Sequence, residues 1–92
     1  MLTISSQFYL ISAKIVNMAS FYFTSGIRKA IGERIMKARK QKKLEQVDVA
    51  AIAGINRSYY GRIEKGEANP TIEKLYKIMK TLDLKSSDVF PF

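Results

Sequence analysis

Residues 54–56, Gly-Ile-Asn, leave only three positions for the chain to turn between two short stretches of helix-like sequence. The first stretch, residues 45–53, carries acidic side chains in its first turn, where they favour the positive end of the helix dipole. Gly54 can adopt the left-handed conformation that ends a helix, and Asn56 is a good N-cap for the next one, residues 57–65. This spacing predicts two helices that are joined by a tight turn and cross closely.

Three more helices are expected around this pair: residues 26–42, a helix capped by Thr71, and a short last turn that Ser86 caps and Phe90 ends. Lys43 is expected at the exit of the first helix, where glycine is preferred because φ is often positive. The apolar stripes consist of Ile27, Ile31, Ile35 and Ala38 in the first helix and Ile72, Leu75, Ile78, Met79 and Leu82 in the fourth. No strand pattern competes after residue 26. The sequence therefore predicts an all-α fold, a compact five-helix bundle spanning residues 26–92.

The composition excludes several kinds of chemistry. The chain contains neither cysteine nor histidine, which removes disulfides, thiol nucleophiles, the usual zinc sites and Ser/His/Asp triads. Its carboxylates form no paired or metal-binding pattern, so we expect no enzyme, no metal and no cofactor. A net charge of +8 on 92 residues indicates a polyanionic partner, although charge alone does not separate nucleic acid from an anionic membrane.

Residues 1–25 form an apolar, hydroxyl-rich extension with a single charged side chain, Lys14. Lys14 leaves an uncharged run of 13 residues on each side, residues 1–13 and 15–27, too short to cross a bilayer of roughly 30 Å. Two interpretations stand equally: translation starts at Met18, or residues 2–23 form a strand or helix that packs on the second helix or pairs between protomers. A membrane tether is a remoter third. A segment of this kind is also a possible site for a protein partner.

Several independent features coincide along residues 31–90. In order they are Arg39, Leu44 with Gln46, the small Ala50 at the helix crossing, Gly54, Ile63-Glu64, Gly66, Asn69-Pro70 and Leu82. Together they resemble the lambda-repressor-like, Cro-type helix-turn-helix family, including its small restriction-modification controller proteins and phage-type repressors. The resemblance implies that residues 57–65 form a recognition helix that lies in the major groove of double-stranded DNA.

The resemblance and the chemistry of the side chains together nominate contact residues. The residues expected to read bases are Arg57, Ser58, Tyr59 and Arg62. The residues expected to hold phosphates are Gln46, Asn56, Lys65 and Asn69. Arginine is favoured as a base reader because its guanidinium can grip guanine O6 and N7 with two bonds. For Tyr59 the alternative to a DNA contact is local packing. For Lys65 and Asn69 the alternative is that they belong only to a solvated loop. In this family the pair matching Arg39 and Glu64 forms a largely buried salt bridge, so we interpret both as structural.

Some positions depart from the family pattern. Glu45 stands where Ser or Thr usually caps the second helix, and Gly61 lies inside the recognition helix, where it costs about 1 kcal/mol relative to alanine. Val47 and Ile52 occupy positions that are usually polar. They are expected to leave an apolar surface on the second helix that another segment could cover.

We expect a cytoplasmic, nucleoid-associated transcription regulator that binds a pseudo-palindromic operator as a homodimer, with no small-molecule ligand evident. The residues expected at the dimer interface are Leu84, Val89, Phe90 and Phe92. Two alternatives stay open: an antitoxin-type regulator that binds both DNA and a toxin, and a protein-interaction module that kept the fold without binding DNA.

Overall fold

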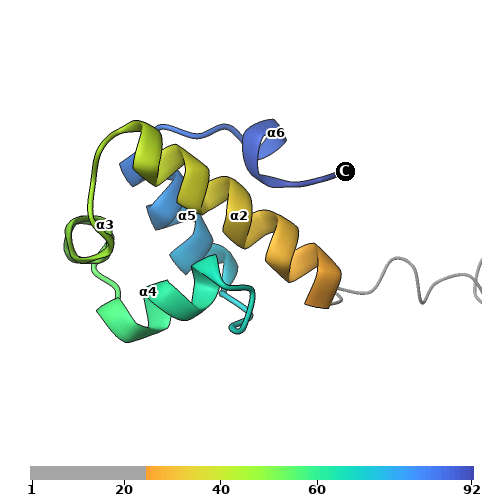
Figure 1. Cartoon of the computed structure of the whole chain (residues 1–92), viewed down its shortest axis with the longest axis horizontal. Coiled ribbons are helices and arrows are strands. Elements are labelled where there is room, and N and C mark those ends of the chain that lie inside the picture. Colours follow the sequence, from red (N-terminus) through yellow and green to blue (C-terminus); the bar gives the residue numbers. More distant parts are fainter. Residues whose placement is uncertain (1–24) are drawn as a thin grey trace, which may run out of the picture.

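Five helices joined by short turns make up most of residues 25–92, the part of the chain that the computed structural model describes (Figure 1). They are α2 (Ser25–Gln41), α3 (Gln46–Ala53), α4 (Arg57–Glu64), α5 (Ile72–Leu82) and α6 (Ser86–Val89). The predicted all-α fold with a helix-turn-helix at α3 and α4 is therefore confirmed. The expectations for residues 1–24 lie outside the described residues.

The helix ends follow the local signals in the sequence. Gly54 ends α3 at φ 68°, the Asn56 side chain accepts a 3.1 Å hydrogen bond from the backbone N–H of Tyr59, and Thr71 caps α5 through Lys74. Lys43 has φ 57° after α2, as expected. The prediction for the last helix was wrong by one residue, because Lys85 occupies the N-cap position and Ser86 is the first helical residue.

The start of α3 compensates for its unusual cap residue. Glu45 lies in the N-cap position, and its backbone N–H donates to the Asp48 carboxylate at 2.8 Å. This bond satisfies one of the donors that a helix N-terminus leaves free. The Asp48 carboxylate thus pairs the backbone N–H of the cap residue, which is a different donor from the one that a Ser or Thr cap takes.

The core is a single apolar cluster to which all five helices contribute. Its largest fully buried side chains are Tyr60, Ile31, Ile35, Ile63, Ile78, Leu82, Val49 and Val89. Of the predicted stripes, Ile27 and Met79 are partly buried and pack against this cluster, whereas Ile72 is 88% exposed. The helical period places Ile72 on the apolar face of α5, but it does not indicate where the core ends, and α5 enters the core only from Leu75 onward.

Glycine permits the closest approach between α2 and α4. A Cβ on Gly32 would overlap the backbone carbonyl oxygens of Ile63 and Glu64. At Gly66, where φ is 74°, a Cβ would come within 2.7 Å of the Lys29 Cα. The end of α4 and the turn after it therefore pack directly on the α2 backbone.

Replacing Gly32 by alanine tests this contact. We expect Gly32→Ala to lower the free energy of unfolding by about 2 kcal/mol, because two backbone segments must move apart to admit the methyl group. Gly61→Ala is the matched control: it is also helical, and its Cβ would lie at an ordinary 3.4 Å from the Gln46 Oε1. Urea unfolding of both variants should show Gly61→Ala equal to or more stable than the parent, and equal losses would contradict this account.

Candidate nucleic-acid interface

Helix α4 has one face in the core and the other exposed. Tyr60, Ile63 and Glu64 are buried, whereas Arg57 and Ser58 are exposed to solvent. The helix lies along one edge of the domain, on the opposite side of α2 from α6 (Figure 1). The core contacts thus fix which side chains α4 presents outward.

The four predicted base readers differ in their surroundings. Arg57, Ser58 and Arg62 are exposed, and Arg62 makes one long contact, 3.4 Å from its Nη2 to the carbonyl oxygen of Glu67. Tyr59 is half-buried and packs against the core. Its hydroxyl donates to the Asn69 carbonyl at 3.3 Å, and the Lys74 Nζ lies 4.4 Å from its ring centroid. The local-packing alternative therefore describes Tyr59 in the free protein.

The four predicted phosphate residues are also not equivalent. Lys65, at the C-cap of α4, and Asn69, in the turn after it, are both exposed. The Asn56 Oδ1 is instead used to cap the start of the same helix. Gln46 is half-buried, and its Nε2 donates to the Glu64 Oε1 at 2.9 Å. The free protein therefore brings Gln46 to the buried ion pair, a contact that the sequence did not indicate.

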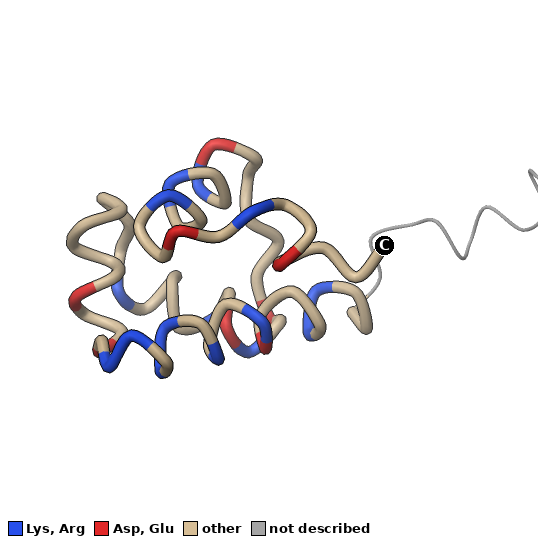
Figure 2. The backbone as a smooth tube through the Cα atoms, turned by 90° about the horizontal axis from the view of Figure 1, so that it is seen from above, with Lys and Arg blue, Asp and Glu red and all other residues tan. Residues whose placement is uncertain are grey.

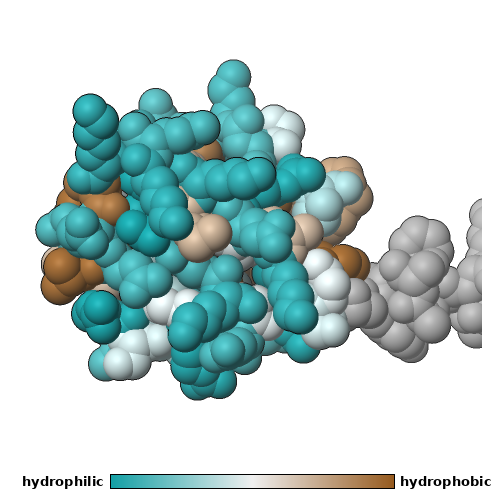
Figure 3. Space-filling view, in the orientation of Figure 1, coloured by the Kyte–Doolittle hydropathy of each residue, from teal (hydrophilic) through white to brown (hydrophobic). Residues whose placement is uncertain are grey.

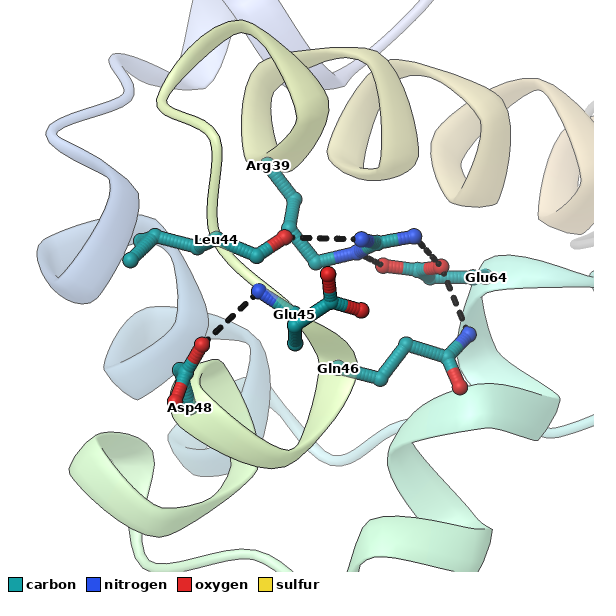
Figure 4. A network of polar contacts seen from close by, with 6 residues as sticks. All are labelled: Arg39, Leu44, Glu45, Gln46, Asp48 and Glu64. Atoms are coloured by element: carbon teal, nitrogen blue, oxygen red, sulfur yellow. Dashed lines mark hydrogen bonds and ion pairs between the residues drawn. The ribbon is translucent and has the colours of Figure 1, made fainter.

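The predicted ion pair of Arg39 and Glu64 joins α2 to the end of α4 (Figure 4). The Arg39 Nε donates to the Glu64 Oε2 at 2.7 Å, and the Nη2 donates to the Oε1 at 3.1 Å. The Arg39 Nη1 also donates to the carbonyl of Leu44, in the turn before α3. With residue exposures of 8% and 4%, the two charges are almost fully removed from water.

The ion pair shifts the titration of both partners. The hydrogen bond to Glu64 raises the pKa of Arg39 above its ordinary value, although burial opposes this. Burial alone would raise the pKa of Glu64, but hydrogen bonds from Arg39 and Gln46 hold it below its usual range. Burial also raises the pKa of the neighbouring Tyr60, whose hydroxyl has no hydrogen-bond partner among the described residues.

The C-terminal residues correct the predicted dimer interface. Val89 is completely buried in the core of its own protomer, so its assignment to a dimer surface was wrong. Leu84 and Phe90 are half-buried against the core, and only Phe92 is fully outward, at 87% exposure. The sequence analysis did not predict a role for Arg34. Its Nη1 donates to the Phe90 carbonyl at 3.0 Å and connects α2 to the end of α6.

Val47 and Ile52 are exposed on α3, as predicted, and separate apolar patches lie on this side of the domain (Figure 3). On α5, Tyr76 is also exposed. An open groove between the two helices is lined by Ile52, Ala53, Gly54, Tyr76, Lys77, Lys80 and Thr81.

Positive charge is not confined to α4. Lys and Arg positions occur along several helices (Figure 2), so the net charge does not by itself define an interface. Helix α4 carries two exposed arginines, Arg57 and Arg62, on eight residues, whereas the longer α2 has one fully exposed arginine, Arg34. Within residues 25–92 no helix is long and apolar enough to cross a bilayer, and no three acidic side chains are grouped to hold a metal ion.

This combination of a tight helix-turn-helix and an exposed arginine-bearing second helix defines a class of DNA-binding domain. The chain belongs to the Cro/cI-type family within this class, because the family profile described as Helix-turn-helix matches residues 35–90.

The chain is similar in sequence to a phage repressor and to a control protein. The chain is similar to the immunity repressor protein of Bacillus phage phi105, with 36% identity over 59 residues, 64% of this chain and 41% of that protein. Control protein C.MunI of Mycoplasma sp is 35% identical over 65 residues, 70% of this chain and 88% of its own length. The match to the phage repressor thus spans less than half of that protein.

Solved structures agree with these relatives. The controller protein C.AhdI from Aeromonas hydrophila superposes with a TM-score of 0.66 at 30% identity, covering 68% of this chain and 96% of its own. The controller protein C.Esp1396I, solved as a tetramer with its natural 35 base-pair operator, gives a TM-score of 0.61 at 31% identity over 66% of this chain and 80% of its own.

The buried ion pair predicts a specific dependence of stability on pH. Because the pKa of Glu64 is lowered on folding from an ordinary value of 4.5, its contribution is present above that pH and is lost as pH falls through the folded-state pKa. Glu64→Gln should lower the free energy of unfolding by about 3 kcal/mol at pH 7, since Arg39 is left buried without a counter-charge. Urea unfolding from pH 7 down to pH 2 should show this difference shrinking below about pH 4.5. A difference that stays constant over this range would contradict the pairing.

Proposed function

We propose that this transcriptional regulator binds duplex DNA by placing α4 in the major groove, with Arg57 and Arg62 directed at base edges. The observation that carries the proposal is the exposure of both guanidinium groups on a helix whose opposite face is anchored in the core. A major groove about 12 Å wide admits such a helix.

The two arginines are suited to sequence discrimination. Each good bidentate contact to guanine contributes roughly 1 to 3 kcal/mol against the wrong base, so two arginines supply much of the selectivity of a half-site. Arg57 is in the first turn of α4, and Arg62 releases only its long bond to the Glu67 carbonyl when it turns to DNA. Ser58 adds a short donor between them, and the edge of the half-buried Tyr59 completes the base-facing set.

Phosphate contacts fix the register of the helix in the groove. Lys65 and Asn69 are exposed near the end of α4, and Asn56 lies at its start. The start of α3 at Gln46 is the remaining part of this clamp, because the positive end of a helix dipole favours an anion. Tyr59 supports this clamp by holding the Asn69 carbonyl.

A homodimer on a pseudo-palindromic operator completes the proposal, because one domain of this size reads only a few base pairs. Its surface is formed by Leu84, Phe90 and Phe92, where exposed aromatic area remains after Val89 is buried. The tetramer of C.Esp1396I on its operator supports an oligomeric state on DNA. A cytoplasmic location and the absence of enzymatic activity follow from the same role. The antitoxin and protein-interaction alternatives are not favoured, since the named relatives are repressors and controllers.

Substitution of each arginine tests the base-reading assignment. Duplexes bound from a random pool should show that Arg57→Ala and Arg62→Ala each lose preference at one or two base pairs, with non-specific affinity only modestly reduced. Lys85→Ala is the matched control, because this exposed cation precedes α6, which lies on the opposite side of α2 from α4. An unchanged sequence preference in both arginine variants would refute the assignment.

Two substitutions of equally exposed residues test the proposed dimer surface. Phe92→Lys should shift the chain from dimer to monomer in sedimentation at tens of micromolar and remove cooperative binding to a two-half-site duplex. Ile72→Lys changes a residue of nearly equal exposure, 88% against 87%, and should leave the dimer intact. A parent chain that sediments only as a monomer, or equal effects of the two changes, would disprove the assigned surface.

A further inference from the structure

Gln46 links the two helices of the helix-turn-helix at the end opposite to their turn. The turn at residues 54–56 joins the C-terminus of α3 to the N-terminus of α4. Gln46 is the first residue of α3, and its side chain reaches Glu64, the last residue of α4 (Figure 4). The two helices are therefore connected at two separated points, the turn and the hydrogen bond from Gln46 to Glu64.

The acceptor of this contact is itself fixed. The Glu64 Oε2 accepts a hydrogen bond from the Arg39 Nε. The Glu64 Oε1 accepts two, from the Arg39 Nη2 and from the Gln46 Nε2. Hydrogen bonds to a carboxylate are stronger than those between neutral groups, and both oxygens here are occupied. Arg39 belongs to α2, so the Glu64 carboxylate is already oriented by α2. The Gln46 amide therefore binds an acceptor whose position is fixed.

The middle of α4 leaves room for the Gln46 side chain. A Cβ on Gly61 would lie 3.4 Å from the Gln46 Oε1 and 3.8 Å from its Nε2. The amide therefore lies along α4 from Gly61 to Glu64, and a methyl group at position 61 would meet it at an ordinary contact distance. A longer side chain at position 61 would compete with Gln46 for this space.

We propose that Gln46 is a positioning residue that fixes the angle between α3 and the recognition helix, acting through Glu64. This proposal rests on the proposed function, in which the start of α3 holds a phosphate and α4 reads bases. By fixing the angle, Gln46 sets the register between these two contacts. A simple phosphate ligand would instead add affinity regardless of what α4 reads.

A double-mutant cycle separates the two roles. Gln46→Leu keeps a side chain of similar size and removes the hydrogen bond. Its affinity should fall ~10-fold or more for the selected operator and stay within about twofold of the parent for random duplex. In an Arg57→Ala background the loss on the operator should shrink to a few-fold, because the contact that depends on the helix angle is already absent. Equal losses on both duplexes, additive with Arg57→Ala, would overturn the positioning role.

A measurement without DNA keeps the two proposals distinguishable. Backbone amide chemical shifts of residues 57–59, at the end of α4 away from Gln46, should move in free, folded Gln46→Leu and Gln46→Met, whereas loss of the local contact alone would change only residues 61–64. Unchanged shifts of residues 57–59 would overturn the positioning role even if DNA affinity fell. If Arg57→Ala alone does not lower operator affinity relative to random duplex, the proposed base reading fails, and the shifts still test Gln46.

Discussion

The buried ion pair between Arg39 and Glu64 is the interaction on which the geometry of this domain depends. Removing two charges from water is costly, and a hydrophobic pair of similar volume often stabilises a fold as well. What an apolar pair does not supply is direction: the planar guanidinium donates two hydrogen bonds to the carboxylate in one orientation, at 2.7 and 3.1 Å. This orientation fixes where α4 ends relative to α2, and it also gives Gln46 a stationary acceptor.

Small residues then bring the backbones close enough for the ion pair to form. Gly32 lies directly against the carbonyls of Ile63 and Glu64, so a side chain there would push the end of α4 away from α2. Ala50 is buried where α3 packs on its neighbours. With the buried face of α4 held in this way, its outward face is determined, and Arg57 and Arg62 point to solvent on a rigid support. Because the backbone of α4 is already held in place before DNA arrives, binding does not have to order it, which reduces the entropy cost.

The parts of the fold that were predictable from the sequence are those with local causes. Gly54, Asn56 and Thr71 act within one turn of helix, and the positive φ of Lys43 follows from its place at a helix exit. The ion pair was predictable only through the family resemblance. The contact of Gln46 with Glu64 spans 18 positions and depends on the crossing angle, so no spacing rule indicates it.

The errors have the same origin. The period of an apolar stripe does not tell where the core stops, which is why Ile72 was assigned to it, and a short helix such as α6 has no period that could have shown Val89 to be buried. For the interface, the exposure of Arg57 and Arg62 followed from the helical pattern, whereas the packing of Tyr59 against Lys74 and Asn69 required the arrangement of the α4–α5 turn in space.

The central claim, that α4 lies in the major groove with its guanidinium groups at base edges, is tested most directly by methylation protection of guanine N7 on a bound duplex. N7 faces the major groove, where a bidentate arginine covers it. The account predicts protected guanines in two half-sites about one helical turn apart, with different guanines losing protection in Arg57→Ala and in Arg62→Ala. Full duplex occupancy with every guanine N7 still reactive would contradict it.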